Sequence, residues 1–550
     1  MTIADYTFPL FKQVRNPEMP NVLLLFTDEQ RYDTIAALGR PHMITPNLDR
    51  LVAEGCAFTH GCTPNPVCVA ARHSLLTGLY ARDHGMPAMG SKVIPPSIPC
   101  LPQILADHGY HCEAVGKMHF QPARSHHGFH RFQTQEELYR NIADDDYAMY
   151  LRAVGLGHIK HVHGIRNPLY LQPQRSLVQE EHHPNTWVAD RAADAIRRCR
   201  NRPFFLWASW IHPHPPLALP DRWAELYAGA SIPLPTPLEA NPNRFLAAQR
   251  RHSDYDDPAK TRRVRELYYG AVSMVDYNIG KVLAALAEIG QLDNTLIIFA
   301  SDHGEMLGDN GAWGKSLPND PSVRVPFIVR YPKLFKPGSK RDDFADLTDI
   351  LPTVLDVAGI KYPGQADLPG ESLTLTAGSK DRSVHYMEHN HNELRVISLR
   401  SHRYKYNYWF DDGREEFYDL ERDPIEIENL LNYKLSAAEH DAYEILKARL
   451  ISYELRDGLR GTVRNGRLAP FEGERWKGWP PCDAGLDWQM PMHIFNLLPE
   501  DPTQYQPDRI EVIEATKKEP VLKLSKLNLD FYLSSGGDPE LVRQIRERNL

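Results

Sequence analysis

Reactive side chains stand directly after four apolar segments of this sequence. Carboxylates, imidazoles and amines are the groups that proteins use to bind metals, move protons and hold anions. In an open α/β sheet, ligands bind outside the carboxyl ends of the strands. One polar residue after a strand is usually a helix cap or part of a solvated loop, but four such strand ends predict a shared site. The side chains are Asp28 and Glu29 after residues 21–27, Lys117 and His119 after 112–116, His212 and His214 after 204–209, and Asp302 and His303 after 294–300.

Two of these strand ends offer ligands for a divalent cation. Asp28, Glu29 and Asp302 would form a hard oxygen site suited to Ca²⁺, Mg²⁺ or Mn²⁺. His303 as a further ligand favours a metal that accepts nitrogen, such as Mn²⁺. We therefore expect one bound cation, Ca²⁺ or Mn²⁺, with Mg²⁺ as the further alternative.

Zinc is a weaker interpretation of the cysteines and histidines. Cys56, Cys62 and Cys68 lack the Cys-x-x-Cys spacing of structural zinc sites. His212 and His214 form a His-x-His pair, but the proline-rich continuation supplies no third ligand. The oxygen-rich cation site is therefore the favoured prediction.

The segment 66–78 (PVCVAARHSLLTG) carries the most specific pattern. It predicts a short helix over residues 69–77 that ends at Gly78 and has Cys68 at its N-terminus. A helix N-terminus favours an anion, and Arg72 lies one turn further on the same side. A nucleophile, a helix N-terminus and a guanidinium together suit a tetrahedral oxyanion such as sulfate or phosphate. The alternative is a buried cysteine without a chemical role, the commonest state of a free thiol.

Alternating strand and helix patterns must position these residues. The apolar runs are short, rich in branched aliphatic residues and bounded by polar ones, which is typical of strands buried on both faces. Helical patterns separate them, so the sequence predicts an α/β fold with a large, mostly parallel central sheet flanked by helices. The predicted strands are 21–27, 112–116, 204–209, 294–300 and 325–330, and the predicted helices are 45–55, 101–107, 186–199, 263–289 and 348–358.

The character of the sequence changes after about residue 380. Residues 1–380 are expected to form the catalytic α/β domain. Within 381–458 the segments are short, β-branched and aromatic, which predicts a small antiparallel sheet with a helix at 436–456. Residues 459–550 form a Trp- and Pro-rich extension, whose apolar side chains predict an oligomerisation segment and hence a homo-oligomer. A strap across its own subunit is the alternative.

The composition excludes several classes of protein. The chain has 550 residues, with 63 Lys and Arg against 71 Asp and Glu and a net charge of −8. Proteins that coat nucleic acid are normally basic, so we expect no nucleic-acid partner. We find neither the about 18 consecutive apolar residues of a membrane span nor a signal peptide, and expect no membrane association. Seven cysteines are few for this length and odd in number, which argues against a disulfide framework and predicts a cytoplasmic location.

Seven short motifs occur in an order that is known from one protein family. With them the sequence, from about residue 20 to 430, resembles the type I sulfatases and the related phosphonate monoester hydrolases of the alkaline phosphatase superfamily. The resemblance implies an alkaline phosphatase-like fold. The motifs are TDEQRYDT (27–34), TPNLDRL (45–51), CVAARHSLLTG (68–78), GKMH (116–119), HPHPP (212–216), SDHGEMLGD (301–309) and WGK (313–315).

The resemblance also implies a cofactor and a cation site. Cys68 would be oxidised by a formylglycine-generating enzyme to formylglycine, whose hydrate is the nucleophile. The modified Cys68 would hold the cation together with Asp28, Asp302 and His303. Glu29, a further candidate ligand, stands where sulfatases usually carry a second Asp and phosphonate hydrolases a Gln.

The remaining residues of the motifs would handle the substrate, again by resemblance. Arg72 would steady the hydrate, and Lys117 would bind the substrate oxyanion. His119 would be the base that releases sulfate. His214 and Lys315 would bind the transferring group and help the leaving oxygen to depart.

Sulfate monoester hydrolysis, of the arylsulfatase type and on a small-molecule ester, is the leading interpretation. A phosphonate monoester or phosphodiester hydrolase on the same scaffold is the alternative, and we expect these activities as side reactions. Lys117 and His119 favour sulfate, because the phosphonate hydrolases carry Tyr and Thr there. The family's modification motif is usually Cys-x-Pro-x-Arg, and here Ala70 replaces the proline. A catalytically inactive binding protein would require the loss of a key position, and all of them are present.

Overall fold

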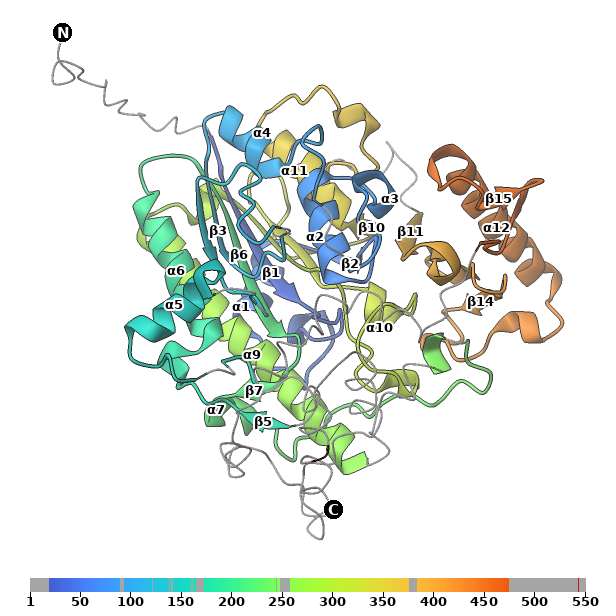
Figure 1. Ribbon diagram of the computed structural model, residues 1–550, viewed down its shortest axis with the longest axis horizontal. Helices are drawn as coiled ribbons and strands as arrows, with labels where there is room; N and C mark the ends of the chain where they lie inside the picture. Colours follow the sequence, from blue (N-terminus) through green and yellow to red (C-terminus); the bar gives the residue numbers. More distant parts are fainter. Residues whose placement is uncertain are drawn as a thin grey trace.

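An eight-stranded mixed sheet forms the centre of the protein (Figure 1). The computed structural model describes residues 19–473, except 90–92, 121, 138, 140–141, 160–161, 165–172, 244, 248–257 and 375–382, together with residue 543. The strand order is β10-β2-β9-β8-β1-β6-β3-β4. All neighbouring pairs are parallel except those that β9 makes with β2 and β8. The strands are β1 (Asn21–Asp28), β2 (Cys56–Cys62), β3 (His111–Gly116), β4 (Arg131–Thr134), β6 (Phe204–Pro213), β8 (Thr295–Ser301), β9 (Phe327–Arg330) and β10 (Ser339–Asp346).

Helices cover both faces of this sheet. In β1, Val22, Leu24 and Phe26 belong to a core layer with α2, α4 and α11, whereas Leu23 and Leu25 face α1, α6 and α9. A strand buried on both faces must be apolar throughout, which is how β1 was predicted from its sequence. The helices are α1 (Pro46–Glu54), α2 (Cys68–Thr77), α3 (Ala81–His84), α4 (Leu101–Asp107), α5 (Asp146–Ala153), α6 (Pro184–Arg198), α7 (Asp221–Ala224), α9 (Pro258–Glu288), α10 (Asp320–Val323) and α11 (Ile350–Val357).

The predicted fold class is confirmed, and three strands of the sheet were missing from the prediction. The five predicted strands correspond to β1, β3, β6, β8 and β9. The sequence of β10, SKRDDFAD, is mostly charged because this strand lies at the edge of the sheet and its first half is partly exposed. The strand β4 has only four residues, too few for a periodic pattern.

A second, antiparallel sheet follows, as predicted. Its order is β11-β12-β13-β14. The apolar side chains of this sheet, Ile397, Leu399 and Tyr406 among them, pack against Leu446 and Leu450 of the following helix. The elements are β11 (Val384–His389), β12 (Val396–Ser401), β13 (Tyr404–Trp409), β14 (Glu415–Asp419) and α12 (Ala437–Asp457), with two short ribbons β5–β7 (Gln174–Arg175, Ala218–Leu219) and β15–β16 (Val463–Arg464, Arg467–Leu468).

The division into three units at 380/381 and 458/459 stays a prediction. Most of the C-terminal extension, 474–550 apart from residue 543, lies outside the described residues, so its predicted role in a homo-oligomer stays a prediction as well. Across the part of the chain that the structure describes, the helices include none with the length and apolarity of a membrane span.

A buried ion network joins the second sheet to the catalytic body. Asp320 of α10 accepts hydrogen bonds from Arg400 Nε and Nη2 at 3.0 Å each and from Lys405 Nζ at 2.6 Å. Burial by itself would raise the pKa of Asp320. The charges of Arg400 and Lys405 outweigh this effect and hold the pKa of Asp320 well below its usual range. Lys405 also binds Glu426. Each charge therefore depends on its partners to remain buried.

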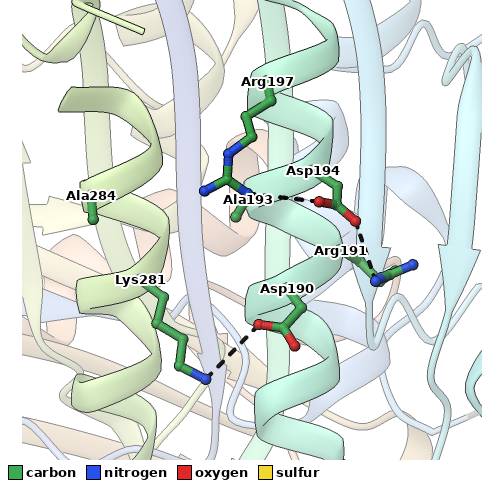
Figure 2. Close-up of a pocket in the computed structure, with 7 residues that line it drawn as sticks. All are labelled: Asp190, Arg191, Ala193, Asp194, Arg197, Lys281 and Ala284. Carbon is green, nitrogen blue, oxygen red and sulfur yellow. Dashed lines mark ion pairs between the residues drawn. The ribbon is translucent and has the colours of Figure 1, made fainter. Parts of the chain in front are cut away.

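We predict that Asp320→Ala lowers the free energy of unfolding by about 3–5 kcal/mol, because it leaves buried cations unpaired. Asp194→Ala is the matched control. Figure 2 shows Asp194 on α6 between Arg191 and Arg197, in ion pairs of 3.2 and 3.7 Å whose partners are all more than a third exposed. Such a surface pair contributes about 1 kcal/mol or less. Urea unfolding would measure both, and equal losses in the two variants would contradict the prediction.

Candidate active site

The predicted strand ends meet at one edge of the central sheet. The strands β8, β1, β6 and β3 are consecutive neighbours, with Thr27 beside Ser301 and Gly116 beside Ser209. The Asp302 backbone N–H donates to Thr27 O at 3.3 Å, and that of Lys117 donates to Ser209 O at 3.0 Å. Parallel pairing thus places the residues after β1, β3, β6 and β8 side by side.

Four fully buried side chains form a group that can hold a metal ion. Asp28, Cys68, Asp302 and His303 each offer one ligand atom, and these atoms all lie within 4.8 Å of one another. The His303 Nδ1–H donates to Gly304 O at 2.9 Å, because a carbonyl only accepts. The lone pair of Nε2 therefore faces Cys68 Sγ, 3.2 Å away. Two carboxylates and an oriented imidazole fit a divalent cation of the Mn²⁺ or Ca²⁺ type.

Helix α2 brings Cys68 and Arg72 into this group. All ten residues of α2 are buried, and Gly78 ends the helix with a φ of 70°, as the sequence predicted. Burial raises the pKa of the Cys68 thiol above its usual range, and nearby Lys315 only partly opposes this. An unmodified Cys68 is therefore a thiol at neutral pH, and a thiol is a poor nucleophile.

The Arg72 guanidinium forms hydrogen bonds that fix other groups of the site. Its Nε donates to Asp302 Oδ2 at 2.9 Å, and Nη1 donates to Lys117 O at 2.6 Å and to Ser209 Oγ at 2.9 Å. Nη2 lies 3.5 Å from Asp28 Oδ2. The guanidinium thus connects the ends of β1, β3, β6 and β8.

Lys117 and His119 leave β3 on a short loop that points into the site. The Lys117 ammonium forms ion pairs with Asp28 and with Glu137. His119 has a left-handed backbone, with a φ of 60°, and its N–H donates to Glu136 Oε1 at 2.9 Å. Burial, and then the charges of Lys117 and Arg72, lower the pKa of His119 well below its usual value. The imidazole is therefore neutral and has a nitrogen that can accept a proton.

His214 and Lys315 meet at the carboxylate of Glu29. His214 Nε2 lies 3.1 Å from Glu29 Oε2, and Lys315 Nζ donates to the same oxygen at 2.9 Å. His214 Nδ1 donates to Pro215 O at 2.6 Å, so both ring nitrogens face acceptors. Burial, with Glu305 adding to it, raises the pKa of Glu29 well above its usual range against the opposing charge of Lys315. Glu29 is not one of the four clustered residues, and its predicted ligand role stays a prediction.

His212 does not join its neighbour in the site. Its Nε2 donates to Pro216 O at 3.3 Å, and its ring stacks on His183. Among the described residues, no metal-compatible group contains His212, Cys56 or Cys62. A second such group joins Asp28 and Cys68 to Glu137 and His214, and a third, formed by His111, Glu113 and Cys199, lies at the other end of β3.

Two acidic residues of the site were missing from the sequence-based prediction. Glu136 and Glu137 follow β4, and Glu137 contacts both Lys117 and His214. The rule that selected the other residues, a polar side chain after a strand, applies to them as well. They were missed because the strand β4 was missed.

This combination of fold and site defines a class of protein. An α/β sheet with two carboxylates, a histidine and a buried cysteine at its carboxyl edge is the arrangement that the resemblance to the alkaline phosphatase superfamily implies. Residues 20–360 match the sulfatase family, and residues 308–454 match a domain described as N-sulphoglucosamine sulphohydrolase, C-terminal. The chain belongs to the sulfatase family, and the resemblance in its motifs is confirmed.

Individual relatives agree with this assignment. The chain is 32% identical over 437 residues to an arylsulfatase of Clostridium perfringens, which covers 75% of this chain and 90% of that protein. It is 28% identical over 480 residues to a multifunctional alkaline phosphatase superfamily protein of Trinickia caryophylli, covering 74% and 91%. The solved phosphonate monoester hydrolase of Silicibacter pomeroyi has the same fold, with a TM-score of 0.68 and 23% identity over 80% of this chain and 96% of that one.

We predict that Asp302→Asn lowers the amount of divalent cation that the purified protein retains, because it removes a negative charge from the buried group that can hold a metal ion. Elemental analysis of wild-type and variant protein measures this. Glu113→Gln is the control, since Glu113 belongs to the separate group with His111 and Cys199. The prediction is wrong if Asp302→Asn keeps its full metal content, or if Glu113→Gln is the variant that loses it.

Proposed function

We propose that this protein hydrolyses sulfate monoesters of small molecules, aryl sulfates among them, with formylglycine at position 68 and one divalent cation. The observation that carries the proposal is the gathering of Cys68, Asp28, Asp302 and His303 within one buried group beside Lys117. Membership of the sulfatase family and the similarity to an arylsulfatase support it.

The cofactors would supply the nucleophile and part of the positive charge. Asp28, Asp302, His303 and residue 68 would hold the cation, which would withdraw charge from the ester, while hydrated formylglycine would offer an oxygen nucleophile. A formylglycine-generating enzyme is the partner that this proposal requires. The elemental analysis described above would identify the bound cation as Ca²⁺, Mn²⁺ or Mg²⁺.

The other side chains would act on the substrate through charge and proton transfer. Arg72 would fix the geometry of residue 68 and of the cation ligands, because its donors bind Asp302 and Lys117 O. Lys117 would bind an oxygen of the sulfuryl group. The neutral His119 would accept a proton when sulfate is released.

Two further side chains, His214 and Lys315, would assist the leaving group. His214 faces acceptors with both ring nitrogens and is placed to give a proton to the leaving oxygen. Lys315, held by Glu29, would add positive charge there. Charge that develops on the leaving oxygen would thus meet preorganised donors.

Hydrolysis of phosphonate monoesters or phosphodiesters is the second candidate. Cations around a tetrahedral oxyanion suit sulfur and phosphorus alike. The similarity to a multifunctional protein of the alkaline phosphatase superfamily favours a broader substrate range. Lys117 and His119 still favour sulfate, because the phosphonate hydrolases carry Tyr and Thr at these two positions of the GKMH motif.

We predict that Cys68→Ala abolishes turnover of aryl sulfates, because it removes the nucleophile. Cys112→Ala, which changes another fully buried free thiol, should keep its activity. Mass spectrometry of the peptide that contains residue 68, after production with and without a formylglycine-generating enzyme, should show the modification only with that enzyme. Substantial activity in Cys68→Ala would refute the assigned nucleophile.

We predict that Lys117→Ala and His119→Ala each slow aryl sulfate hydrolysis by about 100-fold, the effect of losing about 3 kcal/mol of transition-state stabilisation. The loss on aryl phosphonate monoesters should be smaller. Steady-state kinetics on matched aryl sulfates and phosphonates measure this. A wild-type preference for the phosphonate by several orders of magnitude would replace the first proposal with the second.

A further inference from the structure

Glu137 lies inside the candidate active site and has no role in the function proposed above. Its side chain is 3% exposed. One carboxylate oxygen, Oε1, is paired with the Lys117 ammonium, and the other, Oε2, lies 3.6 Å from His214 Nε2. The two groups follow different strands, Lys117 coming directly after β3 and His214 directly after β6. Glu137 is thus a bridge between the group that would bind the sulfuryl oxygen and the group that would serve the leaving oxygen.

The backbone around Glu137 is tied to the loop that carries Lys117. The Gln135 N–H donates to Gly116 O at 3.1 Å, directly beyond the last paired residues of β3 and β4. The Glu136 carboxylate accepts the N–H groups of Met118 and His119 at 2.9 Å each. These bonds fix the segment 135–137 against the segment 116–119.

A second anchor holds this segment from behind. The Glu136 N–H donates to Asp145 Oδ2 at 2.6 Å, and Asp145 Oδ1 accepts the N–H of Ala148 at 2.6 Å. Asp145 is the N-cap of α5, and it is fully buried. The Glu137 carboxylate therefore projects from a backbone that is bonded on two sides, which gives it the rigidity that a supporting residue needs.

The charge of Glu137 is unexpected in a pocket for an anion. A carboxylate beside the substrate would by itself repel a sulfate ester. A carboxylate can nevertheless help to order a nearby lysine. The lysine side chain is long and flexible, and it loses rotamer freedom when its ammonium is held in one place. A carboxylate that contacts both Lys117 and His214 can fix them before the substrate arrives, at the cost of some repulsion.

We propose that Glu137 is a positioning residue that sets Lys117 and His214 in their working geometry. This inference rests on the proposed function, because it assigns Glu137 to the same transition state. It predicts a separation of kinetic effects. Removing the charge should lower kcat, since Lys117 and His214 lose their shared support, whereas KM should stay unchanged or fall, since a negative charge leaves the anion pocket.

The test is steady-state kinetics of Glu137→Gln on a series of aryl sulfates whose phenols differ in acidity. We expect kcat to fall about 10- to 100-fold, the range found for misplaced or unsupported catalytic groups, without a rise in KM. The loss should grow as the phenol becomes a poorer leaving group, because His214 then matters more. Glu137→Asp keeps the charge and should recover part of the activity.

Glu113→Gln is the matched control for this experiment. Glu113 is also 3% exposed and ion-paired, to Arg198, but it lies towards the opposite end of β3. Its substitution should leave kcat and KM unchanged even where it lowers stability. Metal content, modification of Cys68 and thermal unfolding of all variants should be recorded, and Glu137→Gln should resemble the wild type in the first two.

Three outcomes would overturn the inference. One is an unchanged kcat in Glu137→Gln while the wild type hydrolyses aryl sulfates, which would leave the proposed function intact. Another is an equal loss on every leaving group that parallels a loss of metal or of folded protein, because this indicates a purely structural role. A wild type that carries the modified Cys68 and the cation but hydrolyses neither sulfates nor phosphonates would remove the proposed function, and this inference with it.

Discussion

The two carboxylates at the centre of the site, Asp28 and Asp302, are buried completely, and much of the structure follows from their need for positive charge. A carboxylate without a counter-charge is strongly disfavoured in a protein interior. Arg72 contacts both, and Lys117 pairs with Asp28. Arg72 also donates hydrogen bonds to the Lys117 carbonyl and to Ser209. The bonds that neutralise the two carboxylates therefore also fix the relative positions of the four strand ends. Asp302 keeps a pKa below its usual value despite its burial, owing to His303 and then Arg72 and Lys117.

The same region is supported from the second sheet. Glu388 at the end of β11 donates its N–H to Pro64 O at 3.0 Å, and His389 Nδ1 lies 3.0 Å from Asn65 Oδ1. The Ser316 N–H, next to Lys315, donates to Pro66 O at 3.1 Å. Pro64, Asn65 and Pro66, which precede the N-cap residue Val67 of helix α2, are therefore bound by two distant parts of the chain. The position of Cys68 depends on the antiparallel sheet as well as on the central one.

The parts of the protein with a repetitive pattern were predictable, and so were the residues placed by it. The apolar runs of β1 and β8 report burial on both faces, and parallel pairing then requires Asp28 and Asp302 to be neighbours. The C-terminal end of helix α2 was predictable from the sequence, because Gly78 follows its last residue. By contrast, Glu137 follows a strand of four residues, and nothing in RFQT indicates pairing with β3. The orientation of the Glu29 carboxylate could not be predicted from the sequence either. It depends on contacts with His214 and Lys315, which are far away in the sequence.

The edge strand β10 has a further consequence for the behaviour of the protein in solution. An open strand edge can recruit a strand of another molecule and begin aggregation. In SKRDDFAD the side chains of Lys340 and Asp342 are exposed, and the pairing with β2 is irregular between Arg341 and Phe344. Charge and irregularity are the features by which natural sheets discourage such edge-to-edge growth. On the β10 side of the large sheet, these features oppose the addition of a further strand, and they are also the features that made β10 hard to recognise in the sequence.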